Sequence, residues 1–109
     1  MSSIKEIWVK SNHLTGMLPS DMCDNVSTLE VLALRDNQLE GSIPPNIGEC
    51  RALRILWISL NRFSGEIPSE IARLSMLEEL YLGANEFKGG ISREIGKLSR
   101  LQILDISRC

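Results

Sequence analysis

Hydrophobic and variable positions alternate at one place in each of several successive segments of the chain. In the stretch LRILWISLN, Leu56 and Ile58 stand on either side of Trp57. Because successive side chains of a strand point to opposite faces, this alternation predicts short strands with one buried face. The predicted inward pairs are Leu32 and Leu34, Leu56 and Ile58, and Leu80 and Leu82. Trp57 is then expected on the outward face.

These segments recur every 24 residues, as the spacing from Leu29 to Leu53 shows. The predicted blocks are residues 4–28, which contain one extra residue near Asn25, then 29–52, 53–76, 77–100 and a partial block at 101–109. A fixed period in this range is typical of solenoids, in which each repeat packs on its neighbours. We predict a single array over residues 1–109. Because the array has no polar cap at either end, we expect it to be a fragment of a longer one.

Each of the four complete blocks follows L-x-x-L-x-L-x-x-N-x-L or a close variant, and a G-x-I-P motif or a close variant comes after it. This pattern resembles the leucine-rich repeat family, and G-x-I-P is similar to its plant extracellular subtype. The resemblance covers essentially the whole chain, although Ser92 replaces the proline found in earlier blocks. The expected fold is an α/β solenoid, a right-handed coil stack with a parallel concave β-sheet and short 3₁₀ or irregular convex segments.

An asparagine follows each predicted strand. A buried amide can both donate and accept hydrogen bonds, so stacked coils should align these side chains as a ladder that satisfies turn backbone groups. The predicted ladder positions are Asn12, Asn37, Asn61, Asn85 and, with a thiol in the same place, Cys109. Two positions further on, Phe63 and Phe87 take an inward position that Leu14 and Leu39 fill in other coils. Glycine follows in each coil, where the chain must turn.

The residue between the two inward strand positions must face outward. This column contains both tryptophans and the only tyrosine, and it reads Trp8, Ala33, Trp57, Tyr81, Asp105. Tryptophan and tyrosine are enriched at binding hot spots. With Val31 and Ala84 nearby, we expect an apolar patch on the concave face. The predicted ligand-binding residues are Trp8, Arg35, Ile55, Trp57, Leu60, Glu79 and Tyr81.

Two interpretations of the aromatic column remain open. Trp57 and Tyr81 could stabilise each other across neighbouring strands, or they could anchor a partner. Trp8 is separated from Trp57 by Ala33, so about 10 Å lies between the two indoles. With Arg35 nearby, this arrangement could hold one side chain of a partner. A second outward column alternates in charge and is expected to set strand compatibility: Lys5, Glu30, Arg54, Glu78 and Gln102.

The cysteines leave two alternatives open. Cys23 and Cys50 lie on the convex side of successive coils, where they could form a disulfide if their side chains converge. Cys50 also occupies an inward position, so a buried reduced thiol is the other reading. Cys109 is expected to be a free structural cysteine. Asn25-Val26-Ser27 is an N-glycosylation sequon, which predicts a glycan at Asn25.

Composition and charge exclude several functions. A net charge of -2 gives no basic field for nucleic acid, and no apolar run approaches the roughly 20 residues that span a bilayer. No signal peptide is recognised in the first residues. His13 is the single histidine and has no nucleophile placed beside it in the sequence. We therefore expect neither a cofactor, a metal nor an enzymatic site.

The remaining expectation is recognition of a protein or peptide ligand on the concave face. The family resemblance implies a receptor-like kinase or receptor-like protein ectodomain, at the extracellular face of the plasma membrane or secreted, with a leucine-rich repeat co-receptor as a further partner. A kinase domain elsewhere in a longer protein is implied by this resemblance alone. Two alternatives remain: a secreted inhibitor resembling the polygalacturonase-inhibiting proteins, and spacer repeats without a direct ligand.

Overall fold

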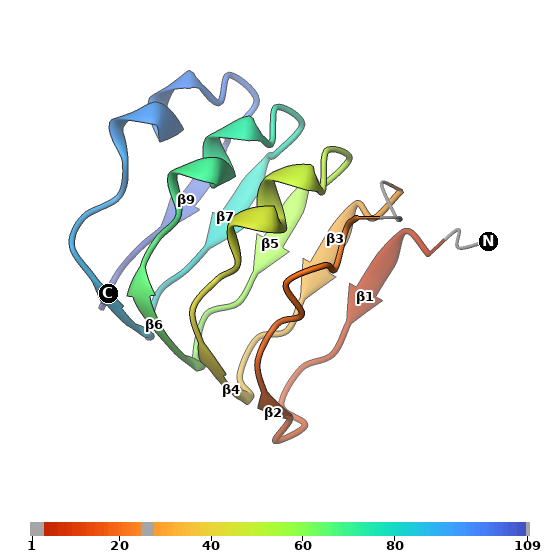
Figure 1. The fold of residues 1–109 in the computed structure, drawn as a ribbon, viewed down its shortest axis with the longest axis vertical. Coiled ribbons are helices and arrows are strands. Elements are labelled where there is room, and N and C mark those ends of the chain that lie inside the picture. Colours follow the sequence, from red (N-terminus) through yellow and green to blue (C-terminus); the bar gives the residue numbers. More distant parts are fainter. Residues whose placement is uncertain (1–3, 25–27, 109) are drawn as a thin grey trace.

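Each coil of the chain adds one strand to a parallel sheet. The structure, a computed structural model, describes residues 4–24 and 28–108. In this part of the chain the strands have the order β1-β3-β5-β7-β9 (Figure 1). Their bounds are β1 (Glu6–Trp8), β3 (Val31–Ala33), β5 (Ile55–Trp57), β7 (Glu79–Tyr81) and β9 (Ile103–Asp105). This stack confirms the solenoid predicted from the alternation and the repeat.

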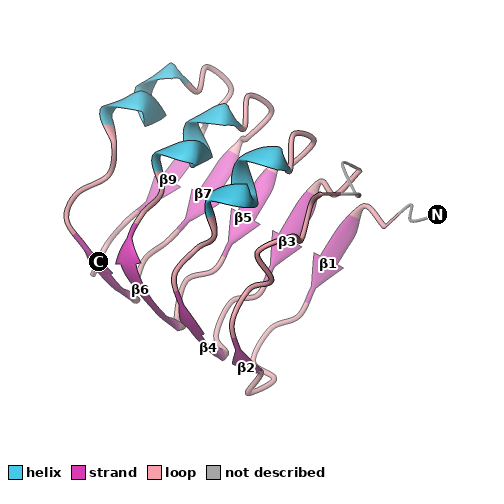
Figure 2. Ribbon diagram, in the orientation of Figure 1, coloured by secondary structure: helices cyan, strands magenta, loops and turns pink. Residues whose placement is uncertain are grey.

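Further elements complete the coils. A second parallel sheet contains β2 (Thr15–Gly16), β4 (Gln38–Gly41), β6 (Arg62–Glu66) and β8 (Glu86–Lys88). The 3₁₀ helices η1 (Pro45–Glu49), η2 (Ser69–Arg73) and η3 (Arg93–Lys97) follow one another along the convex side (Figure 2). Pro44 and Pro68 precede η1 and η2 in an extended conformation. Ser92, which replaces the proline, caps η3 by accepting a hydrogen bond from Glu94 N at 3.1 Å.

The core lies inside the coils and consists of the predicted inward residues. Leu56, Ile58 and Leu80 are fully buried. Phe63 stacks on Phe87, with ring centroids 6.4 Å apart. Because inward side chains of each coil contact those of the next, the core is continuous along the stack.

Inward residues of the first and last described coils are less buried. Leu14 is 39% exposed and Leu104 is 43% exposed. Within the described structure each of these coils has one neighbour, whereas a central coil buries its side chains against two. Leu14 occupies the repeat position of Phe63, but it is not buried as Phe63 is.

The asparagine side chains join neighbouring coils by hydrogen bonds. The Nδ2 group of Asn61 donates to Leu34 O of the preceding coil (3.0 Å) and to Ile58 O of its own coil (3.1 Å). Its Oδ1 atom accepts from the backbone N–H of Leu39 at 3.1 Å. One buried amide thus satisfies backbone groups of two coils.

Asn37 and Asn85 are buried and bonded in the same way. Asn37 Oδ1 accepts from the backbone N–H groups of Asn12 (3.0 Å) and Leu14 (3.1 Å). Asn85 Oδ1 accepts from Phe63 N at 3.0 Å. Asn12 is exposed, and its Nδ2 group donates to Lys10 O at 3.1 Å. Cys109, the fifth predicted position, lies outside the described residues.

The residue before each ladder position has a left-handed backbone conformation. The φ angles are 56° at Ser11, 62° at Asp36, 58° at Leu60, 56° at Ala84 and 61° at Arg108. Few residues other than glycine adopt such angles, and leucine does so at a cost. Because the conformation recurs in successive coils, the turn requires it. Leu60 is 41% exposed at this position, and neither core packing nor the turn explains why a leucine stands there.

The glycines within or directly after the strands of the second sheet turn the chain as expected. Their φ angles range from 72° at Gly89 to 101° at Gly16. These angles favour glycine because a Cβ atom is disfavoured there.

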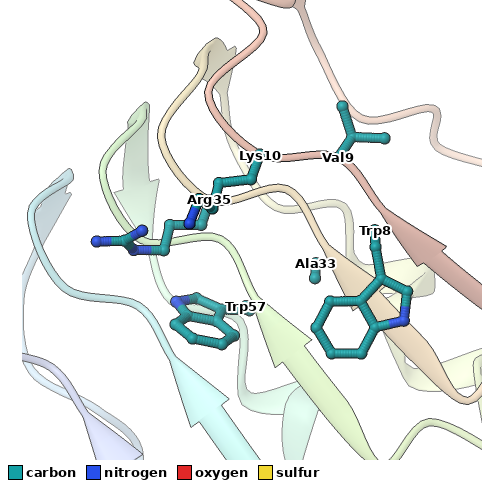
Figure 3. Close-up of a pocket in the computed structure, with 6 residues that line it drawn as sticks. All are labelled: Trp8, Val9, Lys10, Ala33, Arg35 and Trp57. Atoms are coloured by element: carbon teal, nitrogen blue, oxygen red, sulfur yellow. The ribbon is translucent and has the colours of Figure 1, made fainter.

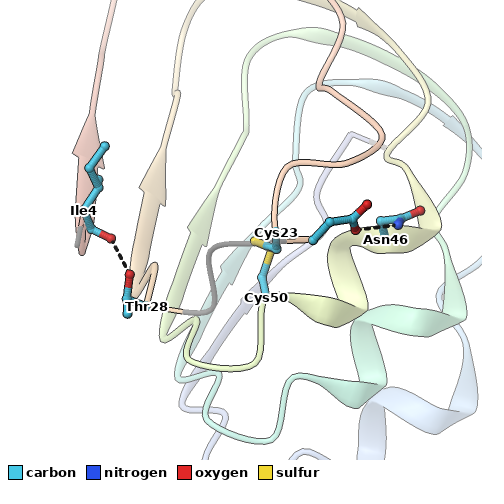
Figure 4. Close-up of a disulfide and its surroundings, with 6 residues drawn as sticks. Ile4, Cys23, Thr28, Asn46 and Cys50 are labelled. Carbon is cyan, nitrogen blue, oxygen red and sulfur yellow. Dashed lines mark hydrogen bonds between the residues drawn. A yellow bond between two sulfur atoms is a disulfide. The ribbon is translucent and has the colours of Figure 1, made fainter. Parts of the chain in front are cut away.

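A disulfide links the first two coils on the convex side. Cys23 and Cys50 have their Cα atoms 5.1 Å apart, and both side chains are almost completely buried (Figure 4). Nearby, Asn46 Nδ2 donates to Asp24 Oδ1 at 3.0 Å and links the same two coils. Of the two alternatives that the sequence left open, the structure has the disulfide, and Cys50 is buried as part of this bridge rather than as a reduced thiol. Asn25 lies outside the described residues, so its glycosylation stays a prediction.

The asparagine ladder leads to a stability prediction. Asn61→Ala leaves several buried backbone groups without partners, and we expect it to lower the free energy of unfolding by about 2–4 kcal/mol. Urea denaturation followed by circular dichroism measures this change. Asn12→Ala is the matched control, because its side chain is exposed and we expect a loss below about 1 kcal/mol. Equal losses in the two variants would show that the ladder bonds do not hold the coils together.

The disulfide leads to a second stability prediction. The Cys23→Ala/Cys50→Ala double variant should have a free energy of unfolding about 2–4 kcal/mol lower than that of the oxidised chain, because the bridge closes a long loop in the unfolded state. A reducing agent should destabilise the parent chain and leave the variant unchanged. Peptide mapping without reduction should recover the Cys23–Cys50 pair. If the denaturation midpoint of the parent chain were the same with and without reductant, the bridge would not be stabilising.

Candidate functional site

The candidate site is the outward face of the five-stranded sheet. The register pairs Trp8 with Ala33, Ala33 with Trp57, Trp57 with Tyr81 and Tyr81 with Asp105. The residues of the outward column therefore stand side by side across the strands. Since the flanking residues Leu56 and Ile58 are fully buried, Trp57 faces outward.

The apolar patch is narrower than the sequence predicts. Val31 exposes 1% of its surface and Ala33 exposes 5%, although both lie in outward columns. Their short side chains stand between longer neighbours, since Val31 pairs with Glu6 on one side and Ile55 on the other. Exposure on this face depends on side-chain length as well as on register. Ala33 is consequently a floor between taller residues.

Trp57 and Tyr81 form a stacked pair. Their ring centroids are 4.2 Å apart and the ring planes differ by 22°. Each ring is also held within its own coil: Trp57 Nε1 donates to Ser59 Oγ at 2.9 Å, and Tyr81 Oη donates to Glu79 Oε1 at 2.8 Å. The two polar tips are thus satisfied, and the ring faces are fixed in position.

Glu79 also affects the ionisation of Tyr81. The hydrogen bond to the Glu79 carboxylate, followed by burial, raises the pKa of the Tyr81 phenol above its ordinary value of 10.0. The phenol therefore remains protonated and keeps donating to Glu79 at neutral pH.

A pocket, here called the first hollow, lies between the two tryptophans. Its volume is about 280 Å³. Its lining residues are Trp8, Val9, Lys10, Ala33, Arg35 and Trp57. Figure 3 shows the two indole rings on either side of Ala33, with Arg35 passing over Trp57. The Arg35 guanidinium carbon lies 5.9 Å from the Trp57 ring centroid, which is within the range of a cation–π contact.

A shallower depression, here called the second hollow, lies on the other side of Trp57. Its volume is about 480 Å³. Its lining residues are Arg35, Trp57, Ser59, Leu60, Tyr81, Gly83, Ala84, Asp105, Ser107 and Arg108. Arg35 and Trp57 line both hollows, so together they form the ridge that separates them.

The structure brings most of the predicted ligand-binding residues around these two hollows. Trp8, Arg35 and Trp57 line the first hollow, and Leu60 and Tyr81 line the second. Ile55 and Glu79 are half-buried neighbours in the sheet register and line neither hollow.

Lys10 is a lining residue that the sequence reasoning missed. It lies two positions after Trp8, as Arg35 lies two positions after Ala33 and Ser59 two after Trp57. This column of residues follows the strands and borders both hollows. Reading the column as a whole would have identified Lys10.

The charged column beside the aromatic one forms ion pairs in its centre. Arg54 lies 3.5 Å from Glu30 and 3.2 Å from Glu78, measured between nitrogen and carboxylate oxygen. The hydrogen bond with Glu78 is the largest cause that raises the pKa of the Arg54 guanidinium. Such exposed pairs contribute little to stability, so this column serves mainly to match neighbouring strands.

Other kinds of site find no support in the described part of the chain. Over residues 4–24 and 28–108, no group of three or more His, Cys, Asp or Glu residues could hold a metal ion. The same residues form no helix of the length and apolarity that crossing a bilayer requires.

Comparison with known proteins agrees with this geometry. The Leucine Rich Repeat family model matches residues 28–50 and 52–74. A probable LRR receptor-like serine/threonine-protein kinase of Arabidopsis thaliana is 47% identical over 45 residues, which are 41% of this chain and 5% of that protein. The chain therefore spans a small part of this curated relative.

Solved structures of plant receptors have the same fold. The plant peptide hormone receptor RGFR1 in complex with RGF2 is 41% identical with a TM-score of 0.87, over 92% of this chain and 16% of that one. The Arabidopsis receptor kinase HAESA, in complex with the peptide hormone IDA and the co-receptor SERK1, is 33% identical with a TM-score of 0.82, over 84% and 16%. The chain therefore has the leucine-rich repeat fold, matches the Leucine Rich Repeat family model in two of its coils, and is similar to part of the ectodomains of plant receptor kinases.

Proposed function

We propose that this chain recognises a protein or peptide ligand on its concave face, as part of the ectodomain of a receptor-like kinase or receptor-like protein. The observation that carries the proposal is the aromatic column around the two hollows. Trp8 is 58% exposed, and Trp57 and Tyr81 are half-buried beside it. Aromatic side chains held rigidly on a concave surface are typical anchors for a partner.

Packing within the sheet accounts for only part of this column. The stack of Trp57 on Tyr81 stabilises two neighbouring strands by about 0.5–1.5 kcal/mol. Trp8 forms no such stack, because its register neighbour is Ala33. Its indole donates to Glu6 Oε1 at 2.8 Å and leaves its ring largely in solvent. The ring therefore offers an exposed aromatic surface to a partner.

The similar structures support a peptide ligand and a second receptor chain as partners. RGFR1 is in complex with RGF2, and HAESA is in complex with both a peptide hormone and a co-receptor. By extension, the concave face of this chain binds a peptide or protein ligand, and a leucine-rich repeat co-receptor completes the complex. A kinase domain in a longer protein that contains this segment belongs to the same proposal.

The same proposal places the chain at the extracellular face of the plasma membrane or in a secreted protein. The Cys23–Cys50 disulfide supports this location, because such bridges persist in oxidising compartments. The predicted glycan at Asn25 would require passage through the secretory pathway.

The central prediction concerns Trp57. Peptides selected from a displayed random library on the parent chain should bind Trp57→Ala at least about tenfold more weakly, because a central aromatic anchor is lost. Affinity is measured by titration calorimetry. The matched control is Arg62→Gln, which changes an exposed residue of the second sheet and should leave affinity unchanged. Selected peptides that bind Trp57→Ala as tightly as the parent would favour spacer repeats instead.

The same variant separates binding from folding. Trp57→Ala should lower the free energy of unfolding less than Leu56→Ala, for which a loss of about 2–5 kcal/mol is expected at a fully buried site. Thermal melting of the two variants measures the difference. Equal losses would show that Trp57 serves the sheet rather than a ligand.

A further inference from the structure

The first hollow combines two aromatic walls with two cations. Trp8 and Trp57 form the walls, Ala33 forms the floor, and Lys10 and Arg35 follow β1 and β3 at one rim (Figure 3). None of the six lining residues carries a carboxylate. The positive charge at this rim is therefore uncompensated within the hollow itself.

The nearest acidic residues along the chain are engaged elsewhere. Asp36 follows Arg35 directly, and its carboxylate accepts a hydrogen bond from Ser11 Oγ at 2.7 Å. The salt bridges found among the described residues include neither Lys10 nor Arg35. Both cations are thus available to an anion that enters from solvent.

A negative charge lies beyond the Trp8 wall, outside the hollow. Glu6 precedes Trp8 by two residues, so both side chains lie on the outward face of β1. The Trp8 indole nitrogen points away from Ala33 and Trp57 in Figure 3, and it donates to Glu6 Oε1 at 2.8 Å. A ligand anion is therefore attracted toward Lys10 and Arg35 and repelled from the Glu6 side.

The space between the walls fits one ring. Trp8 and Trp57 lie on strands two positions apart in the sheet, which separates their backbones by about 10 Å. A flat aromatic group can contact both indoles in that gap, because aromatic pairs are favourable at centroid separations of about 4.5–7 Å. The volume of about 280 Å³ also corresponds to one large side chain rather than to a longer segment.

We propose that the first hollow binds an acidic peptide by one aromatic side chain that lies next to a carboxylate in the ligand sequence. The ring enters between Trp8 and Trp57, and the neighbouring carboxylate pairs with Lys10 and Arg35. This inference rests on the proposed function and specifies the ligand class that the concave face accepts. It makes Lys10 a residue that determines ligand specificity.

Matched tetrapeptides test the proposal. The probes are acetyl-Gly-Phe-Asp-Gly-amide and two variants of this peptide, one with Asn and one with Lys in place of Asp. The chain has two tryptophans, so the two indole N–H signals in an NMR spectrum report directly on the walls. The Asp peptide should bind about three- to tenfold more tightly than the Asn peptide and more tightly still than the Lys peptide.

Variants identify the groups responsible. Lys10→Gln and Arg35→Gln should each reduce the preference for Asp over Asn, and the double variant should abolish it. Trp8→Ala should weaken binding of all three peptides. Arg62→Gln removes the same charge from the second sheet and should leave the preference intact. Loss of the preference in Arg62→Gln would show that overall charge, and not the rim, selects the ligand.

The outcome separates this inference from the proposed function. Equal affinity for the Asp and Asn peptides would overturn the acidic-peptide inference, while library-selected peptides that depend on Trp57 would still support binding on the concave face. If the selected peptides bind Trp57→Ala as tightly as the parent chain, and no tetrapeptide shifts either indole signal, both proposals fail. A Lys10→Gln/Arg35→Gln double variant that keeps the full preference would also overturn the inference, because the anion would then be bound elsewhere.

Discussion

The hydrogen bonds of the buried asparagine amides set the spacing on which the other features of the molecule depend. At the end of each strand the backbone turns inward and leaves carbonyl and N–H groups away from water. Asn61 satisfies such groups in its own coil and in the coil before it. Because each amide reaches the same groups, every coil meets the next with the same register. The aromatic column and both hollows are consequences of this alignment.

The central coils were predictable because their environment repeats. Period-two alternation identified Leu56 and Ile58 as inward and Trp57 as outward, and a 24-residue period assigned Asn61 to the ladder. The exposure of Leu14 was not predictable from its position in the repeat alone, since burial requires a coil on each side. A repeat pattern describes the position of a residue, but the number of packed neighbours decides how much of it is covered.

The sequence predicted which residues share the outward face of the sheet, but it did not predict how exposed each of them is. The sequence placed Trp8 and Trp57 on one face with Ala33 between them, and the structure has this arrangement. It could not show that Ala33 and Val31 lie below the surface, because that depends on the lengths and rotamers of their neighbours. The Cys23–Cys50 pair posed the same difficulty. Two cysteines on adjacent coils bond only if their side chains converge, and the repeat spacing does not fix how two side chains outside the strands are oriented relative to each other.

The disulfide makes one end of the described solenoid different from the other. Coils of such a stack interact with their immediate neighbours, so each contact between coils can open on its own. The bridge joins the first two coils into one cooperative unit, and the contacts between later coils rely on non-covalent packing alone. The first two coils therefore cannot separate fully while the disulfide is intact. β1 and β3, which border the first hollow, belong to the two bridged coils, so these two strands stay covalently linked when later coils open.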